Sequence, residues 1–474
     1  MNTKLPDINT EFSEWYNEVV RRAKLADHAP VRGCMVVRPY GCAIWENIQA
    51  IVDKKIKDTG HQNALFPLFI PESFLKREAD HVAGFSPELA VVTHAGGKEL
   101  EEPLVVRPTS ETIIHYMFAQ WLVSWRDLPI KINQWANVVR WEMRPRAFLR
   151  TTEFWWQEGH TAHETEQEAE EETLCMLEQY RDLIENYLAI PVFAGQKSEQ
   201  EKFAGALKTY TLEAIMPDGK ALQMCTSHRI SQTFAHAFDM SFQDRNGNVS
   251  FPHLTSWAVT TRAIGAMIMM HGDNKGLIIP PKIAPIQVII IPICNDKNRT
   301  EVMQYIHVIE QELKTHNIRI AIDNDAQSTP GAKYHEAELR GIPLRLEVGP
   351  RDVTSNVVTI VDRLSSAKEV VVRDSLVATI EQKLALIQKM LFENACARRQ
   401  QQERIITALS DIANSIEEHR GYFVTSWCGD VACETALKEY KASIRCLRPD
   451  SRIQDFCFCC KNPRVTDIIV ARSY

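Results

Sequence analysis

The chain has 474 residues, of which 45% are hydrophobic and 24% are charged, so it can form a substantial core and is not a disordered protein. Its 54 lysines and arginines face 61 aspartates and glutamates, and the net charge of −7 excludes a protein that coats nucleic acid with a uniformly basic surface. No apolar run reaches the roughly 18–20 residues of a membrane span, and the polar start of the chain shows no signal peptide. We therefore expect a cytoplasmic protein of about three domains without membrane contact.

Residues 1–283 form the first predicted block, in which helical patterns are mixed with aromatic-rich runs typical of strands. Six glutamates lie within residues 164–172. They are compatible with an acidic segment that binds a partner, but we favour the first turns of a helix, because glutamate interacts well with the positive end of the helix dipole. Three prolines within residues 277–285 mark a linker at the end of the block.

The second block, residues 286–375, alternates strand and helix patterns, which predicts a small α/β domain with a mostly buried sheet. A continuous apolar run predicts its first strand, and an amphipathic period predicts its first helix. The expected strands are residues 287–292, 318–323, 344–348, 356–361 and 369–373, and the expected helices are residues 300–316 and 333–340.

The third block, residues 376–474, begins with a long helical pattern over residues 376–419 and ends in a cysteine-rich segment. Half of the 12 cysteines lie in this block after the helix, which favours a metal site over a disulfide framework. Four thiolates suit tetrahedral Zn²⁺ in a closed structural site. The C-x4-C and C-x2-C spacings point to Cys428, Cys433, Cys457 and Cys460, with Cys459 able to replace either of the last two and Cys446 left as a free thiol.

The segment of residues 139–154 carries the clearest chemical signal. Arg140 and Glu142 alternate with apolar neighbours, which predicts a strand with one solvent-facing side, and after a basic loop the chain returns with Arg150 and Phe154. These arginines can surround one polyanion, because the guanidinium group donates paired hydrogen bonds to phosphate and stays charged. Phe154 can stack on a purine. A ladder of surface ion pairs would produce a similar short pattern.

This segment resembles motif 2 of the class II aminoacyl-tRNA synthetases. Residues 60–67 (GHQNALFP) resemble motif 1, whose proline lies at the dimer interface in that class, and residues 256–265 (SWAVTTRAIG) resemble motif 3. A closer resemblance to the prolyl-tRNA synthetase family covers essentially the whole chain and includes residues 107–111, 155–160, 223–228 and 349–352 and the last residue, Tyr474. In that family the carboxylate of a final tyrosine approaches the active site.

The resemblance implies that ATP and L-proline form prolyl-adenylate and pyrophosphate, and that the prolyl group then passes to tRNA(Pro). The carboxylate of proline attacks the α-phosphorus, so catalysis depends on positioning and charge stabilisation and needs no protein nucleophile. Arg140 and Arg262 would be the catalytic residues, with Arg140 touching both the α-phosphate and the proline carboxylate. ATP, together with Mg²⁺, would contact Arg140, Glu142, Arg150, Thr151, Phe154, Gln223, Thr226, Thr260 and Arg262.

The proline pocket is assigned by the same resemblance. Glu111 can supply a carboxylate for the secondary ammonium of proline, and Trp156 an apolar wall for its ring. A histidine taken alone is more often structural, and only the surrounding motifs favour a role in the site. The pocket would consist of Thr109, Glu111, Arg140, Trp156, Glu158, His160, His228 and Ser256.

The second block resembles the anticodon-binding domain of the family. Charged side chains there could read the guanines of a proline anticodon, although a solvated face of ion pairs is nearly as good an interpretation for each residue alone. The candidates are Lys333, Glu338, Arg340, Arg345, Glu347 and Arg351. Two positions depart from the family pattern: Ala258 stands where glycine is usual, and Ala337 where tryptophan is common.

The resemblance thus predicts an α/β protein with three parts: an α+β catalytic domain with an antiparallel active-site sheet (1–283), an anticodon-binding α/β domain (286–375) and a C-terminal zinc-binding domain (376–474). The segment between Arg140 and Arg262 is too short for the editing domain that one branch of the family inserts there. The chain therefore resembles the archaeal and eukaryotic type, and we expect a homodimer that activates alanine and cysteine without hydrolysing mischarged tRNA.

Two alternatives belong to other functional classes. A non-catalytic paralogue that binds tRNA or senses amino acids would be expected to lack Arg140, Glu142 or Arg262, and all three are present. A synthetase for threonine or serine is the second alternative. A zinc-dependent threonine site would require a set of cysteine and histidine ligands inside the first block, and the sequence shows no such set there.

Overall fold

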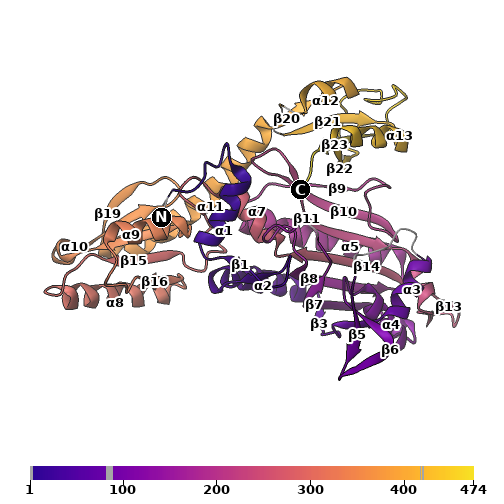
Figure 1. Ribbon diagram of the computed structural model, residues 1–474, viewed down its shortest axis with the longest axis horizontal. Coiled ribbons are helices and arrows are strands. Elements are labelled where there is room, and N and C mark those ends of the chain that lie inside the picture. The colour runs from indigo at the N-terminus through magenta and orange to yellow at the C-terminus, as the bar shows by residue number, and fades with distance from the viewer. Residues whose placement is uncertain (1–3, 82–88, 143, 417, 419–420) are drawn as a thin grey trace.

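The computed structural model describes residues 4–81, 89–142, 144–416, 418 and 421–474. Figure 1 shows a large central part, a small α/β part at one end and a C-terminal part that projects to one side. Helix α11 (Leu376–Gln401) runs from the small part toward the C-terminal part, and the end of the chain returns to the central sheet. The α/β fold class predicted from the sequence is confirmed.

An eleven-stranded sheet forms the centre of the molecule. Its neighbouring strands run antiparallel except for the two outermost pairs, one at each edge. In spatial order the strands are β20 (Glu403–Ile405), β21 (Tyr422–Trp427), β23 (Thr466–Ala471), β22 (Ser443–Arg448), β9 (Phe193–Gln196), β10 (Ala206–Ile215), β11 (Ala221–Ile230), β14 (His253–Thr260), β8 (Glu153–His163), β7 (Ile130–Val139) and β3 (Gln62–Asn63).

The sheet crosses from the first block of the chain into the third. Strand β22 pairs with β9 at Leu447 and Gln196, so the C-terminal part continues the central sheet instead of standing apart from it. Within residues 140–262 the structure describes strands of this sheet, short peripheral elements and helix α5 (Glu166–Asp182), with no inserted domain among the described residues. The expected absence of an inserted editing domain therefore agrees with the described part of the chain.

Helices cover one face of the sheet. Helix α5 packs against β11 and β14, and the hydroxyl of Tyr180 donates to Gln157 on β8. Trp257 lies across Gly159 of the neighbouring strand, where an added Cβ atom would fall 1.9 Å from the indole ring, so glycine is required at this close approach. The other helices of this core are α1 (Phe12–Arg22), α2 (Pro39–Asp58) and α7 (Arg262–His271).

The predicted helix at the glutamate-rich segment is confirmed as α5. Thr165 caps it, accepting from the backbone N–H of Glu168 while the carboxylate of Glu168 accepts from the N–H of Thr165. A second layer beside the sheet contains β4 (Phe69–Pro71), β5 (Ala90–Ala95), β6 (Lys98–Val106), α3 (Glu72–His81), α4 (Glu111–Trp121) and α6 (Gln232–Ala237), and short pairs are formed by β1 (Ala26–His28) with β2 (Met35–Val37) and β12 (Phe242–Gln243) with β13 (Val249–Ser250).

The small α/β part has every element that the sequence predicts, with shifts of a few residues at most. Its sheet has the order β16 (Ile320–Ile322), β15 (Val288–Pro292), β17 (Leu344–Val348), β18 (Val357–Asp362) and β19 (Lys368–Val372). Its helices are α8 (Arg299–Thr315), α9 (Pro330–Leu339) and α10 (Pro350–Ser355). Helix α9 begins three residues earlier than expected because the side chain of Thr329 caps it before Pro330.

Two expectations are wrong in detail. The helix predicted over residues 376–419 ends at Gln401, because the chain leaves it to add β20 beside β21 and then forms the separate helix α12 (Leu409–Ser415). The predicted linker of residues 277–285 is a packed segment, in which Leu277, Ile279 and Ile283 are fully buried. The final helix, α13 (Val431–Thr435), precedes the single turn η4 (Ala436–Tyr440).

Candidate active site

A cavity of about 800 Å³ opens on the face of the central sheet opposite α5. Strands β8, β10, β11 and β14 form its floor, and the β7–β8 loop and the start of α4 form much of its wall. The structure brings all sixteen residues predicted for proline and ATP to this cavity: Thr109, Glu111, Arg140, Glu142, Arg150, Thr151, Phe154, Trp156, Glu158, His160, Gln223, Thr226, His228, Ser256, Thr260 and Arg262.

A row of polar side chains crosses the floor of the cavity. His160, Ser256, His228 and Thr209 lie directly opposite one another on four adjacent antiparallel strands. The hydroxyl of Thr209 lies 2.9 Å from Nδ1 of His228. Burial lowers the pKa of His228 to about 3, with a smaller contribution from His160, so His228 is uncharged at neutral pH.

Two buried carboxylates stand at one end of this row. Glu158 accepts hydrogen bonds from Ser110 and from Nε2 of Gln134 at 2.7 Å, and Nε2 of His160 lies 3.1 Å away. Burial alone would raise the pKa of Glu158, but these hydrogen bonds outweigh it and hold the pKa below its ordinary value. Glu111 is also buried and accepts from the hydroxyl of Thr109.

Arg140 faces the two carboxylates from the rim of the cavity. Its Nε donates to the carbonyl of Pro108 at 2.9 Å, and its guanidinium carbon lies 5.5 Å from the ring centroids of both Phe154 and Trp156. Glu111 and Glu158 both raise the pKa of Arg140 and so oppose the lowering caused by desolvation. The group can therefore meet an anion between two aromatic rings and two carboxylates.

The expected strand around Arg140 and Glu142 is wrong in its bounds. Strand β7 ends at Val139, and the backbone N–H of Arg140 donates to the carbonyl of Thr152 as the chain turns away from the sheet. Because residues 140–142 and 144–152 lie outside the strands of the sheet, they form the wall of the cavity instead of its floor.

Arg262, the first residue of α7, reaches the same cavity from the other side. Its Nε donates to the carbonyl of Leu149 at 3.2 Å, and a terminal nitrogen donates to the carbonyl of Gln223 at 3.1 Å. Burial, followed by repulsion from Arg140, lowers its pKa to about 10, so the group remains charged at neutral pH. Nearby, Arg150 forms an ion pair with Glu142.

The sequence did not single out several residues that shape the site. Ser110 and Gln134 hold Glu158 in place, and the ring of Phe203 lies 4.9 Å from that of His228. Ala258, which departs from the family pattern, lies on the cavity floor, so its methyl group occupies room in the cavity. No local pattern marks Gln134 or Phe203, because only the fold brings them to the site.

The predicted cysteine cluster is a compact group in the C-terminal part. The Sγ atoms of Cys428, Cys433, Cys457 and Cys460 all lie within 4.8 Å of one another. Cys428 follows β21, Cys433 lies on α13, and the other two lie in the loop between β22 and β23. Cys459, the alternative ligand, lies outside this group and donates its backbone N–H to Cys457.

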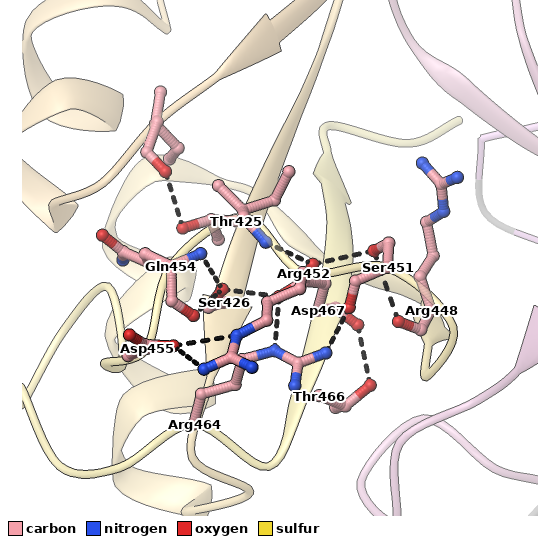
Figure 2. Close-up of polar contacts among 12 residues, drawn as sticks. Thr425, Ser426, Arg448, Ser451, Arg452, Gln454, Asp455, Arg464, Thr466 and Asp467 are labelled. Atoms are coloured by element: carbon pink, nitrogen blue, oxygen red, sulfur yellow. Dashed lines mark hydrogen bonds and ion pairs between the residues drawn. The ribbon is translucent and has the colours of Figure 1, made fainter.

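A polar network supports the segments that carry these cysteines (Figure 2). At its centre is the fully buried Asp467 of β23, which accepts from Ser426, from Ser451 at 2.8 Å and from Nε of Arg464 at 2.9 Å. It also accepts from the backbone N–H of Ile453 at 2.8 Å. Ser426 lies two residues before Cys428, so the network ties β21 to the loop that leads to Cys457.

Comparisons with known proteins agree with this arrangement. The chain matches the class II tRNA synthetase core domain (G, H, P, S and T) over residues 92–271, an anticodon-binding domain over residues 287–383 and a prolyl-tRNA synthetase C-terminal domain over residues 409–474. It is 50% identical to a proline–tRNA ligase of Borreliella burgdorferi (strain ZS7), with 98% of each chain covered. The chain belongs to the proline–tRNA ligase family.

Other relatives extend this family likeness. A proline–tRNA ligase of Chloroherpeton thalassium is 51% identical over 94% of the chain and 93% of its own length. The crystal structure of a prolyl-tRNA synthetase from Cryptosporidium parvum, complexed with halofuginone and AMPPNP, superposes with a TM-score of 0.94 at 40% identity and covers both chains completely. The family predicted from the sequence is confirmed, and nothing found supports the non-catalytic alternative.

The candidate anticodon residues are mostly paired with one another or with close neighbours. Lys333 pairs with Asp323 at 3.1 Å, and Arg345 pairs with Glu347 at 3.1 Å and lies 4.1 Å from the ring of Tyr334. Around them, Glu347 also binds Lys368, and Glu338 lies 3.7 Å from Arg345, while Arg340 stacks on Tyr40 of the central part at 4.2 Å.

Arg351 and Ala337 are two further positions of the small α/β part that the sequence singled out. Arg351 is exposed on α10. Ala337 is buried against Ile289, Ile291 and Ile342, so the tryptophan common in the family would not fit there without rearrangement. Among the helices that the structure describes, none has the length and apolar character needed to cross a membrane.

Proposed function

We propose that the large cavity is the site at which the chain joins proline to ATP and passes the prolyl group to tRNA. The chain is an ATP- and Mg²⁺-dependent proline–tRNA ligase, as its family implies. One observation carries the assignment of the site: residues of five quoted sequence segments (107–111, 139–154, 155–160, 223–228 and 256–265) line one cavity on an antiparallel sheet. In this cavity the enzyme needs no nucleophile of its own, because the substrate carboxylate attacks the α-phosphorus.

The charges at the inner end suit the amino group of proline. Glu111 and Glu158 face Arg140, so two carboxylates share only one guanidinium. A secondary ammonium bound beside them would restore the balance, and Trp156 would provide an apolar wall for its ring. Arg140 would then hold the substrate carboxylate close to the α-phosphate.

The outer end suits the nucleotide. Arg140, Arg150 and Arg262 surround the space where the phosphates would lie, and stabilise the charge that develops as the bond to the leaving group breaks. Phe154 offers a ring for the adenine. Glu142, Thr151, Gln223, Thr226 and Thr260 would complete the ATP site.

Amino-acid-dependent ATP–pyrophosphate exchange tests this assignment. We expect exchange with proline, little with threonine, serine or histidine, and none in Arg140→Ala. The control is Arg351→Ala, which removes an exposed arginine of the small part and should leave exchange unchanged. Near-normal exchange in Arg140→Ala would remove Arg140 from the site, and no exchange with any amino acid in the folded wild type would favour a non-catalytic paralogue.

The small α/β part is proposed to bind the tRNA anticodon. Lys333, Glu338, Arg340, Arg345, Glu347 and Arg351 are candidates, and the ion pairs among them would have to open or share their donors with the bases. Arg351 would not have to break an ion pair to bind a base, because it forms none among the described residues. Its replacement by alanine should raise the KM for tRNA(Pro) without changing exchange.

We also propose that the four-cysteine group holds a structural Zn²⁺. A tetrahedral site with Zn–S bonds of about 2.3 Å has sulfur–sulfur edges of about 3.8 Å. Cys428 lies 3.8 Å from Cys433 and 3.6 Å from Cys460, which suits this geometry. Cys428→Ser should therefore lower zinc content and thermal stability more than exchange, whereas Cys459→Ser should not. Unchanged zinc content in Cys428→Ser would contradict the ligand set.

A homodimer is the proposed assembly, with the motif 1 region at its interface. Leu65, beside the edge strand β3, is 88% exposed, and Phe69 and Trp121 are also exposed, with the ring of Trp121 6.1 Å from that of Phe66. Leu65→Asp should shift the mass measured by light scattering toward the monomer. The control Val465→Asp, at an exposed position of the C-terminal part, should not.

The division into residues 1–283, 286–375 and 376–474 is retained as a proposal with one refinement. Leu376, Ile380 and Leu384 pack into the core of the small α/β part, so the first half of α11 is assigned to that core. A reducing cytoplasm is the proposed compartment, because a thiolate zinc site requires reduced cysteines.

A further inference from the structure

One hydroxyl group joins the floor of the cavity to a loop at its rim. Thr209 is a buried residue of β10, and its Oγ1 atom lies 2.9 Å from Nδ1 of His228 on the neighbouring strand. The same oxygen accepts a hydrogen bond of 2.9 Å from the backbone N–H of Phe203. All three residues line the cavity, but Thr209 is not among those proposed to contact proline or ATP.

The loop of residues 197–203 is anchored at both ends. At its start, the backbone N–H of Lys197 donates to the carbonyl of Thr209 at 2.8 Å. The hydroxyl of Ser198 then donates to the carboxylate of Glu434 on α13 at 2.5 Å, and both of these side chains are buried. Because the loop is held in this way, the N–H of Phe203 is a fixed donor to the hydroxyl of Thr209.

These contacts decide which nitrogen of His228 carries the proton. The N–H of Phe203 can only donate, so it uses a lone pair of the Thr209 oxygen. The hydrogen of this buried hydroxyl then needs an acceptor, and Nδ1 of His228 is within reach. Burial lowers the pKa of His228 to about 3, so the uncharged ring has a single N–H at neutral pH, and Nε2 carries it.

The same contacts hold two rings side by side. The ring centroids of Phe203 and His228 are 4.9 Å apart, and the ring planes are inclined by 38°. His228 lies opposite Ser256 in the row of polar side chains on the cavity floor. Since Nδ1 is occupied by Thr209, Nε2–H is the polar group that His228 can offer to a ligand.

We propose that Thr209 is a positioning residue of the proline pocket, whose hydroxyl fixes the tautomer of His228 and holds Phe203 beside it. The inference rests on the proposed function, in which His228 belongs to that pocket. In the selected tautomer, His228 offers a hydrogen-bond donor to an oxygen of the prolyl group. The other tautomer would present a lone pair to the same oxygen, and the two would repel each other.

Removal of the hydroxyl tests the proposal in the full chain. Thr209→Val nearly keeps the size of the side chain, and the KM for proline in ATP–pyrophosphate exchange should rise about tenfold, because a buried hydrogen bond is lost and its partners are left unpaired. The KM for ATP should hardly change, since the nucleotide is proposed to bind at the other end of the cavity. Thr209→Ser keeps the hydroxyl and should keep the KM for proline.

The matched control is Thr425→Val. It removes the hydroxyl of another buried threonine of the same sheet, which donates to the carbonyl of Ile406 at 2.9 Å. This variant should lose stability without a change in the KM for proline. An equal rise in Thr425→Val and Thr209→Val would overturn the positioning role, and so would equal rises of the KM for proline and the KM for ATP in Thr209→Val.

Nitrogen-15 NMR of histidine-labelled wild-type protein measures the tautomer directly, with the His228 signals assigned by their loss in His228→Gln. An unprotonated Nδ1 and a protonated Nε2 are expected. A protonated Nδ1 would overturn the proposal even if Thr209→Val failed to fold, and an unchanged KM for proline in folded Thr209→Val would overturn it too. Wild-type protein without proline-dependent exchange would contradict the proposed function instead, and the tautomer could still be measured.

Discussion

Glu158 in the cavity and Asp467 in the C-terminal part are both buried carboxylates that accept several hydrogen bonds, but they differ in the kind of donor that they meet. The donors to Glu158 are Ser110, Gln134 and the His160 ring, whereas Asp467 accepts directly from the guanidinium of Arg464. In both cases burial would raise the pKa, and the hydrogen bonds outweigh it and lower the pKa.

The difference separates a binding site from a structural support. Asp467 is neutralised where it stands, so its network stabilises the C-terminal fold and has no charge to offer a ligand. Among the described residues no lysine or arginine donates a hydrogen bond to Glu158, so its charge remains available to a cationic substrate. The predictions below test this contrast.

Glu158→Gln should have the largest effect. The amide keeps the size of the side chain but removes the charge, so proline-dependent exchange should fall at least about 100-fold. The control Glu201→Gln changes an exposed carboxylate at the cavity rim and should have little effect. Near-normal exchange in Glu158→Gln would mean that its charge serves only the fold.

Asp467→Asn should affect stability instead of exchange. It removes the buried charge that pairs with the partly exposed Arg464, which should lower the free energy of unfolding by about 3 kcal/mol. Urea unfolding and the rate of zinc loss to a chelator would measure the effect, with the exposed Asp455→Asn as control. A loss of exchange greater than the loss of folded protein would give Asp467 a direct part in the site.

His228→Gln should change the pH dependence of stability. The folded pKa of about 3 lies below the ordinary 6.5, so between these values the unfolded chain binds more protons, and His228 makes stability fall as the pH is lowered. The variant should therefore lose less stability over this window, by up to about 1 kcal/mol per pH unit. Parallel curves of stability against pH for the variant and the wild type would contradict the lowered pKa of His228. The exposed His316→Gln serves as control.

Arg452→Gln should have the smallest effect. Arg452 and Asp455 are 72% and 60% exposed, so their ion pair is screened by solvent and should contribute little to stability. Thermal unfolding would show a shift near the error of the measurement. A loss comparable to that of Asp467→Asn would show that the drawn network in Figure 2 acts as one unit.

Much of the fold followed from local patterns. The strands and helices of residues 286–375 were predicted within a few residues, because apolar periodicity and end signals agree there. The helix predicted to continue to residue 419 ends at Gln401 although no glycine or proline stands there. Pairing of β20 with β21 decides this end, and such a long-range contact leaves no mark in the helical pattern.

The sequence by itself determined the motifs that resemble the family and the spacing of the four grouped cysteines, and the resemblance implied the sixteen residues that line the cavity. Only the tertiary structure decided that Ser110 and Gln134 hold Glu158 and that Asp467 stands under the cysteine loops. A buried charge must be satisfied by whatever donors the fold brings to it, and those donors lie far apart in the chain.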